Sequence, residues 1–176
     1  MRVIFLDFDG VINSAQSARF WHRRRDQSKW ENELYSQWPG TIKEYIANEF
    51  CPIALSNLEE LMITVPDLKV VVSSTWRLGE TVESLQKILY PAKPLADAII
   101  DVTPSLGYKD GKRMDRGHEI QDWLDRHPEV TNYVIIDDDG DMLDSQKEHF
   151  VHTSHFHGFQ HGDMLWALRI LGEKYY

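Results

Sequence analysis

The chain has 176 residues, of which 42% are hydrophobic and 27% are charged, and its formal net charge is −9. This length is typical of one domain with a real core, and the composition is that of an ordinary globular protein. The negative charge argues against broad, non-specific binding to a nucleic-acid backbone.

Three features of the sequence bear on location. No apolar run approaches the roughly 20 residues that a membrane-spanning helix needs, so we expect no membrane partner. Arg2 is followed by only four apolar residues before Asp7, which does not resemble a signal peptide. Cys51 is the single cysteine. No disulfide partner is therefore evident, and we expect a buried structural thiol in a reducing, cytoplasmic protein.

The first predicted element is a buried strand over Val3 to Leu6, followed directly by Asp7, Phe8, Asp9 and Gly10. Open α/β sheets hold their ligands at the carboxyl ends of their strands. Gly10 predicts a tight exit at which the backbone closely approaches another group. Two carboxylates at this spacing can bind a hard divalent cation, attack a phosphorus atom and carry a proton.

Residues 13–52 carry no strong strand signal and are rich in Trp, Arg, Gln and Glu. An arginine cluster here has two interpretations, a solvated helix face or a contact for substrate phosphates: Arg19, Arg23, Arg24 and Arg25. The aromatic residues of the segment form either a small core of their own or a surface on which a base stacks: Phe20, Trp21, Trp30, Tyr35 and Trp38.

A second strand is predicted over Leu68 to Val72, followed by Ser73, Ser74, Thr75, Trp76 and Arg77. If a helix begins here, its backbone amides can face an anion. The plain alternative is that one hydroxyl caps the helix. Arg77 either holds substrate or pairs with an acid.

Later elements alternate in the same way. Strands are predicted over residues 98–102, 133–136 and 150–152, and helices over 56–62, 82–89, 117–126 and 163–171. This alternation predicts an α/β fold with a parallel sheet. The strand at 133–136 runs into Asp137, Asp138, Asp139, Gly140 and Asp141. The five histidines between His149 and His161 are irregularly spaced and do not predict a zinc site.

The sequence Asp7-Phe8-Asp9-Gly10-Val11 resembles motif I of the haloacid dehalogenase-like (HAD) superfamily. These enzymes use the first Asp as nucleophile and the second as general acid/base, with Mg²⁺ as cofactor. The resemblance implies a Rossmann-like three-layer sandwich with a five-stranded parallel sheet in the order 5-4-1-2-3. It further implies a single domain over residues 1–176, with a small cap-type insertion after the first strand over approximately 13–52, which would shield the site and select the substrate.

The resemblance also implies roles for individual residues. Ser73 best fits the motif II hydroxyl that binds a phosphoryl oxygen, Ser74 is the second choice, and Gly10 and Arg77 would join Ser74 in contacting substrate. Arg116, at the start of a predicted helix, is the first choice for the motif III cation. Its alternatives are Lys109, Lys112 and Arg113.

The acidic run after the fourth strand corresponds to motif IV. Asp7, the backbone carbonyl of Asp9, and Asp137 would be ligands of Mg²⁺, and Asp138 would be a further ligand, directly or through water. A calcium loop is the rival interpretation of this run, but the properly spaced Glu of such a loop is missing.

A narrower resemblance is to the HAD domain of predicted RNA-repair (Swiss Army Knife) proteins. It rests on the Ser-Ser-x-Trp-Arg signature at 73–77 and on Glu-Ile-Gln-x-Trp-Leu at 119–124. The implied function is a Mg²⁺-dependent phosphomonoesterase that works through an aspartyl-phosphate, with a nucleic-acid end or nucleotide as its candidate substrate. The acidic net charge instead suggests a small-metabolite phosphate as substrate. A third hypothesis is a non-catalytic phosphate-binding module.

Overall fold

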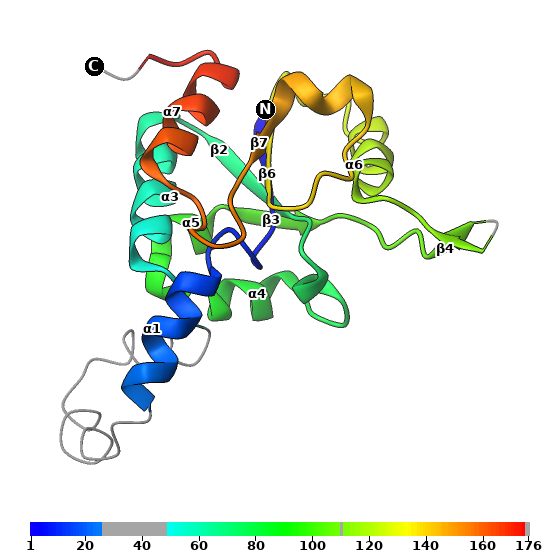
Figure 1. The fold of residues 1–176 in the computed structure, drawn as a ribbon. Coiled ribbons are helices and arrows are strands. Elements are labelled where there is room, and N and C mark those ends of the chain that lie inside the picture. The colour runs from blue at the N-terminus through cyan, green and yellow to red at the C-terminus, as the bar shows by residue number, and fades with distance from the viewer. Residues whose placement is uncertain (26–48, 110, 175–176) are drawn as a thin grey trace.

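The computed structural model describes residues 1–25, 49–109 and 111–174 (Figure 1). Five strands form the main sheet: β1 (Arg2–Leu6), β2 (Leu68–Val72), β3 (Ile99–Val102), β6 (Asn132–Asp137) and β7 (Phe150–His152). Neighbouring strands pair in parallel, in the order β3-β2-β1-β6-β7. This is the predicted order 5-4-1-2-3 counted from the opposite edge, so the α/β fold and the sheet order are confirmed.

Helices cover both faces of this sheet (Figure 1). The helices of the described residues are α1 (Ala15–Arg25), α3 (Pro52–Thr64), α4 (Val82–Ile88), α5 (Lys93–Asp97), α6 (Arg116–Asp125) and α7 (His161–Ile170). Of these, α1 projects away from the sheet (Figure 1). Short 3₁₀ segments lie at η1 (Thr75–Arg77), η2 (Tyr90–Ala92) and η3 (Asp144–His149). Side chains of α3, α4, α5 and α7 share one buried cluster, and side chains of α6 belong to a second. The sandwich therefore has three layers.

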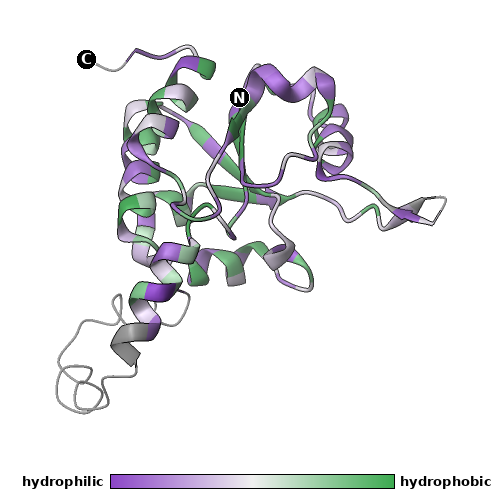
Figure 2. Cartoon of the chain, viewed as in Figure 1, coloured by the Kyte–Doolittle hydropathy of each residue, from purple (hydrophilic) through white to green (hydrophobic). Residues whose placement is uncertain are grey.

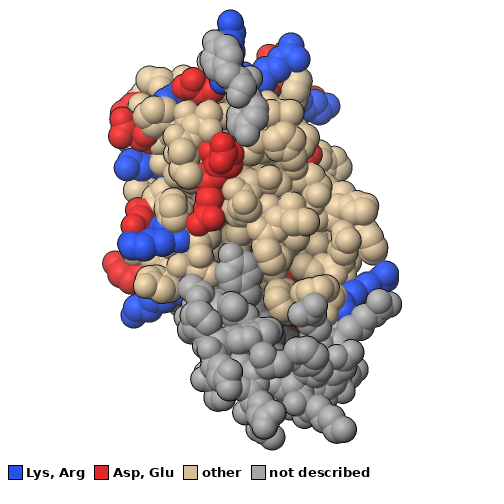
Figure 3. All heavy atoms as spheres, turned by 90° about the vertical axis from the view of Figure 1, so that its left-hand side faces the viewer, with Lys and Arg blue, Asp and Glu red and all other residues tan. Residues whose placement is uncertain are grey.

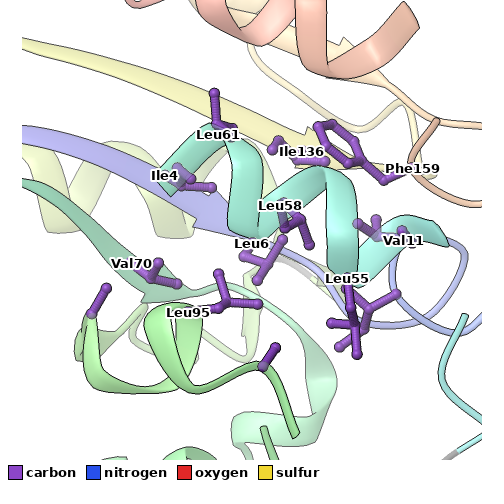
Figure 4. Close-up of a cluster of buried hydrophobic side chains, with 14 of the residues drawn as sticks. Ile4, Leu6, Val11, Leu55, Leu58, Leu61, Val70, Leu95, Ile136 and Phe159 are labelled. Carbon is purple, nitrogen blue, oxygen red and sulfur yellow. The ribbon is translucent and has the colours of Figure 1, made fainter. Parts of the chain in front are cut away.

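The central strand β1 shows why the sheet is buried on both faces. Ile4 and Leu6 point into the larger cluster, whereas Val3 and Phe5 point into the cluster beneath α6. Successive side chains of a strand alternate between faces, so a run that is apolar throughout fits a strand covered on both sides. Accordingly, the strands of the sheet carry hydrophobic residues, coloured green in Figure 2. Figure 4 shows Leu58 of α3 packed among the side chains of the larger cluster.

The helices differ from their predicted bounds mainly at their beginnings. α3 begins at Pro52, four residues before the predicted start, because proline is well tolerated in the first turn of a helix. Cys51 precedes it, buried and free, as predicted. The helix α1 was not predicted, nor was the hairpin of β4 (Tyr108–Lys109) and β5 (Lys112–Arg113), whose strands are too short to give a periodic signal.

The predicted cap-type segment lies partly outside the described residues. Within the described part, Trp21 is buried and its indole N–H donates to the carbonyl oxygen of Phe50, at 2.9 Å, whereas Phe20 is exposed. Trp30, Tyr35 and Trp38 lie outside the described residues. The cap and its bounds therefore stay a prediction. Across the described ranges, no helix has the length and apolar character that crossing a membrane requires.

Candidate active site

The site forms where β1, β2 and β6 end at one edge of the sheet. Leu6 pairs with Val72 on one side and with Ile136 on the other. The residues that follow these three positions, Asp7, Ser73 and Asp137, are therefore neighbours. The ladder continues into the site, because the Asp7 N–H donates to the Ile136 carbonyl at 3.0 Å and the Ser73 N–H donates to the Leu6 carbonyl at 3.0 Å.

Arg116 is the cation that the fold brings against these carboxylates. Its Nη1 donates to Asp7 Oδ1 at 2.9 Å, and its Nε lies 3.4 Å from Asp137 Oδ2. All three side chains are almost fully buried, which strengthens the interactions relative to a surface pair. Of the four predicted candidates for the motif III cation, Arg116 is the one placed here, and the other three lie in the β4–β5 hairpin.

The start of α6 fixes the position of Arg116. The Arg116 backbone N–H donates to Asp141 Oδ2 at 3.0 Å, and the Gly117 N–H donates to the Asp141 carbonyl at 3.2 Å. A Cβ at Gly117 would lie 2.6 Å from the backbone nitrogen of Leu143. Only a glycine lets the first turn of α6 approach the loop after β6 this closely.

The two buried carboxylates repel each other and lack full solvation. Burial, and secondly the charge of Asp7, raise the pKa of Asp137 to about 8, against the opposing attraction of Arg116. Burial also raises the pKa of Asp7, although Arg116 and a hydrogen bond from Ser74 oppose this. One guanidinium is therefore not enough to neutralise the cluster.

The same carboxylates fit a divalent metal ion. One oxygen from each of Asp7, Asp137 and Asp138 lies within 4.8 Å of the others. Asp137 Oδ1 accepts the Asp139 N–H at 2.9 Å, but the buried Oδ2 has no hydrogen-bond partner among the described residues. A buried carboxylate oxygen that accepts no hydrogen bond, beside two further carboxylates, suits a hard cation such as Mg²⁺. The described residues contain no other such group, so the histidines do not form one.

The position of the Asp138 side chain explains why residue 10 is a glycine. Its φ is +69°, and a Cβ there would collide with Asp138 Oδ2. The close approach predicted for this backbone is therefore an approach to an acidic side chain. His155 lies beyond it, with Nδ1 2.7 Å from Asp138 Oδ2.

The two serines after β2 face different surroundings. The Ser74 hydroxyl donates a hydrogen bond to Asp7 and accepts the Trp76 backbone N–H at 3.3 Å. The Ser73 hydroxyl is buried without a hydrogen-bond partner among the described residues, while the Ser73 carbonyl accepts from Arg116. Ser74, the second choice from the sequence, is thus the hydroxyl that contacts the predicted nucleophile, and the predicted role of Ser73 stays a prediction.

Arg77 is buried, and its predicted contact with substrate stays a prediction. The sequence left open an acid partner, and the structure supplies one, because Arg77 Nη2 lies 2.6 Å from Glu119 Oε2 with both side chains buried. Its nitrogens donate further hydrogen bonds to four carbonyl oxygens: those of Ser73, Ser74, Thr103 and Pro104. A guanidinium engaged in this way holds β2, β3 and α6 together.

The side chain of Asp9 lies apart from the carboxylate cluster. It is exposed, and its two oxygens accept hydrogen bonds from Asn13 and Trp76. Because the Asp9 carboxylate is exposed and Asp7 is buried, Asp9 suits the role of a group that exchanges protons with substrate and water. Its predicted contribution to the metal, through the backbone carbonyl, stays a prediction.

Residues 3–164 match the model of one protein family, the HAD domain in Swiss Army Knife RNA repair proteins. The chain belongs to this family. Both the broader and the narrower resemblance are therefore confirmed, and this HAD domain is a hydrolase of the HAD superfamily. No curated protein and no solved structure matches the chain significantly.

Some residues of this HAD domain could not be found from sequence patterns. Asn13 is a single polar residue in a loop, and nothing in the sequence indicated that its amide contacts Asp9. Asp141 belongs to the acidic run after β6, but its hydrogen bond to the start of α6 could not be predicted from that run. Trp76 was recognised as part of a signature, but nothing in the sequence indicated that its indole contacts Asp9.

Proposed function

We propose that this HAD domain is a Mg²⁺-dependent phosphomonoesterase that works through an aspartyl-phosphate on Asp7. The observation that carries the proposal is the buried Asp7 carboxylate, held 2.9 Å from Arg116 and grouped with Asp137 and Asp138. A cation beside a nucleophilic carboxylate offsets the repulsion between the nucleophile and an anionic phosphate.

In the proposed reaction, an Asp7 oxygen attacks phosphorus and the bond from phosphorus to the leaving oxygen breaks. Asp9 gives its proton to that leaving oxygen. Arg116 stabilises the charge on the other phosphoryl oxygens, and the Ser73 or Ser74 hydroxyl donates to one of them. Water then attacks the aspartyl-phosphate, Asp9 takes the proton of that water, and Asp7 is released with inorganic phosphate.

Asp7, Asp137 and Asp138 would hold the Mg²⁺, with the Asp9 carbonyl as a further ligand. When bound, the ion supplies positive charge that polarises the phosphoryl group. It would also neutralise the carboxylates that Arg116 leaves uncompensated.

The proposed substrate is a nucleic-acid end or a nucleotide. The family description names RNA repair proteins, which supports this class. On the side where α3 and α7 lie, the Lys and Arg of the described residues stay near the margins and form no central basic patch (Figure 3). This side therefore gives no support for binding along a nucleic-acid backbone, and the proposal places recognition at one terminal phosphate.

One observation favours a small-metabolite phosphate instead. A pocket of about 160 Å³ adjoins Arg116 and is lined mainly by acids: Asp115, Glu119, Asp139 and Asp141, with Thr75 and Met114. Such a lining repels additional phosphates of a polyanion. A small monoester without further negative charge suits it better. For either substrate we propose a reducing, cytoplasmic location, supported by the single buried cysteine.

The test is phosphate release with Mg²⁺ by the wild type, Asp7→Asn and Asp144→Asn. Asp144 is exposed and outside the site, so its variant is a matched control. The substrates are an aryl phosphate, sugar phosphates, nucleoside monophosphates, and oligonucleotides phosphorylated at either end. We expect Asp7→Asn alone to lose activity. Equal rates in all three proteins would contradict the proposal, and no release from a Mg²⁺-binding wild type would favour a binding module.

A further inference from the structure

Both oxygens of the Asp9 carboxylate are held by neutral donors from different parts of the chain. Trp76 Nε1–H donates to Oδ2 at 3.0 Å, and Asn13 Nδ2–H donates to Oδ1 at 2.9 Å. The proposed reaction uses Asp9 but assigns no role to either donor. These two bonds fix the plane of a carboxylate whose χ2 is otherwise loosely restrained.

The Trp76 indole is itself fixed by the core. Its ring packs against Phe8, with centroids 5.5 Å apart, and against Phe50, at 6.5 Å. Both phenylalanines are fully buried. The backbone N–H of Trp76 is also bound by the Ser74 hydroxyl. The indole ring is therefore held in place by buried side chains, and its N–H stays directed at Asp9.

Asn13 is equally anchored, through the turn that follows β1. Its backbone N–H donates to the Phe8 carbonyl at 3.1 Å, and its carbonyl accepts the Gly10 N–H at 2.8 Å. Asp9 lies inside this turn. One donor thus comes from the same turn as Asp9, and the other comes from η1 after the neighbouring strand β2.

We propose that Trp76 is the positioning residue for Asp9, assisted by Asn13. The two bonds turn the carboxyl toward the leaving group and keep it apart from Asp7, Asp137 and Asp138. Each carboxyl oxygen that accepts one hydrogen bond retains a second lone pair, and that lone pair can carry the exchanged proton. The inference rests on the proposed function, because a proton donor matters only where a phosphate ester bond breaks.

The chemistry gives this role a specific signature. When the P–O bond breaks, an alkoxide needs the proton from Asp9, whereas a nitrophenolate leaves readily without it. Loss of positioning should therefore slow an alkyl ester far more than a nitrophenyl ester. We compare kcat/KM values because kcat/KM covers the steps up to departure of the leaving group, before water uses Asp9 as a base.

The test uses the whole chain carrying Trp76→Phe, which removes the N–H donor and keeps an aromatic ring against Phe8 and Phe50. With Mg²⁺, we expect kcat/KM for a nucleoside 5′-monophosphate to fall about 10- to 100-fold, within the range of general-acid contributions. For p-nitrophenyl phosphate we expect a fall below about 3-fold, since general-acid help is nearly dispensable there. Trp166→Phe, which alters an exposed Trp of α7, is the matched control and should change neither value.

A second measurement needs no turnover. In protein labelled with ¹⁵N-tryptophan, the indole signal missing from Trp76→Phe identifies Trp76. Asp9→Asn replaces a charged acceptor by a weaker neutral one, so this signal should move upfield while the Trp166 signal stays in place. Conversely, an unmoved Trp76 signal would overturn the contact.

The outcomes separate the two proposals. Equal losses on both esters in Trp76→Phe would show a merely structural role and overturn the inference, leaving the phosphatase proposal in place. If the wild type hydrolysed neither ester, the proposed function and the proton-transfer role of Trp76 would be rejected together. The indole signal would then still decide whether the Asp9 contact exists.

Discussion

Asp137→Asn should stabilise the metal-free protein while abolishing its response to Mg²⁺. Asp137 is fully buried, and burial together with Asp7 raises its pKa from 3.8 to about 8. At pH 7 the folded wild type therefore holds a proton on Asp137, whereas the unfolded chain has released it. The amide introduced by the substitution acquires no such proton, and its oxygen can still accept the Asp139 N–H.

The sign and size of the effect follow from proton linkage. Between pH 4 and 8 the unfolded wild type binds fewer protons than the folded protein, so its free energy of unfolding falls as pH rises. Each pH unit contributes at most about 1.4 kcal/mol, which gives an upper bound of about 4 kcal/mol at pH 7. Structural relaxation reduces this, and we expect Asp137→Asn to gain about 1–2 kcal/mol, or roughly 2–8 °C in melting temperature.

The assay is thermal and urea unfolding in EDTA at several pH values between 4 and 8, repeated with saturating Mg²⁺. The advantage of Asp137→Asn over the wild type should grow with pH in EDTA. Mg²⁺ should raise the melting temperature of the wild type but not that of Asp137→Asn, because a ligand stabilises only the state that binds it. Asp144→Asn, at an exposed site, should follow the wild type. Parallel pH profiles for wild type and Asp137→Asn in EDTA would refute the reasoning.

Three further substitutions test the surroundings of the site. Gly10→Ala places a Cβ on the Asp138 carboxylate at a positive φ, so Mg²⁺ affinity measured by calorimetry should fall at least about 10-fold; unchanged affinity would contradict the assigned contact. Arg77→Met removes the cation that pairs with buried Glu119, and urea unfolding should show a loss of about 3–5 kcal/mol. A loss of activity without destabilisation would contradict this structural role and favour the predicted contact with substrate. Gly117→Ala adds a Cβ that pushes the start of α6 away from the loop after β6. The misplaced Arg116 should lower kcat about 10-fold, while circular dichroism should show that the variant still folds. An unchanged kcat would refute this prediction.

The sheet could be predicted because its strands leave a local signal in the sequence. A short run that is apolar throughout, such as Val3 to Leu6, is typical of a parallel strand, and acids directly after such a run lie at the edge where ligands bind. The predicted site residues Asp7, Asp137 and Asp138 meet there for that reason, and the start of α6 adds Arg116. The β4–β5 hairpin was missed because two residues per strand show no alternation.

The contacts of Arg77 and of the two serines could not be predicted from the sequence. An Arg shortly after a phosphate-binding turn and an Arg that bridges buried elements look alike in a sequence. Glu119, which decides between them, lies 42 positions away on another helix. Similarly, Ser73 and Ser74 are adjacent hydroxyls, and the local twist of the chain after β2 determines which one faces Asp7.

The charge balance of the site explains why its parts come from so many elements. Asp7, Asp137 and Asp138 crowd together although Arg116 alone cannot neutralise them, so the metal-free fold is held in an unfavourable state that a divalent cation relieves. Such a site persists only where the surrounding structure enforces it. Asp141 and Gly117 fix the position of the Arg116 guanidinium, and the apolar strands fix the positions of the carboxylates. At the proposed Mg²⁺ site, the repulsion that weakens the metal-free protein is the same interaction that would attract the ion. Stability and metal affinity should therefore change in opposite directions when Asp137 is replaced.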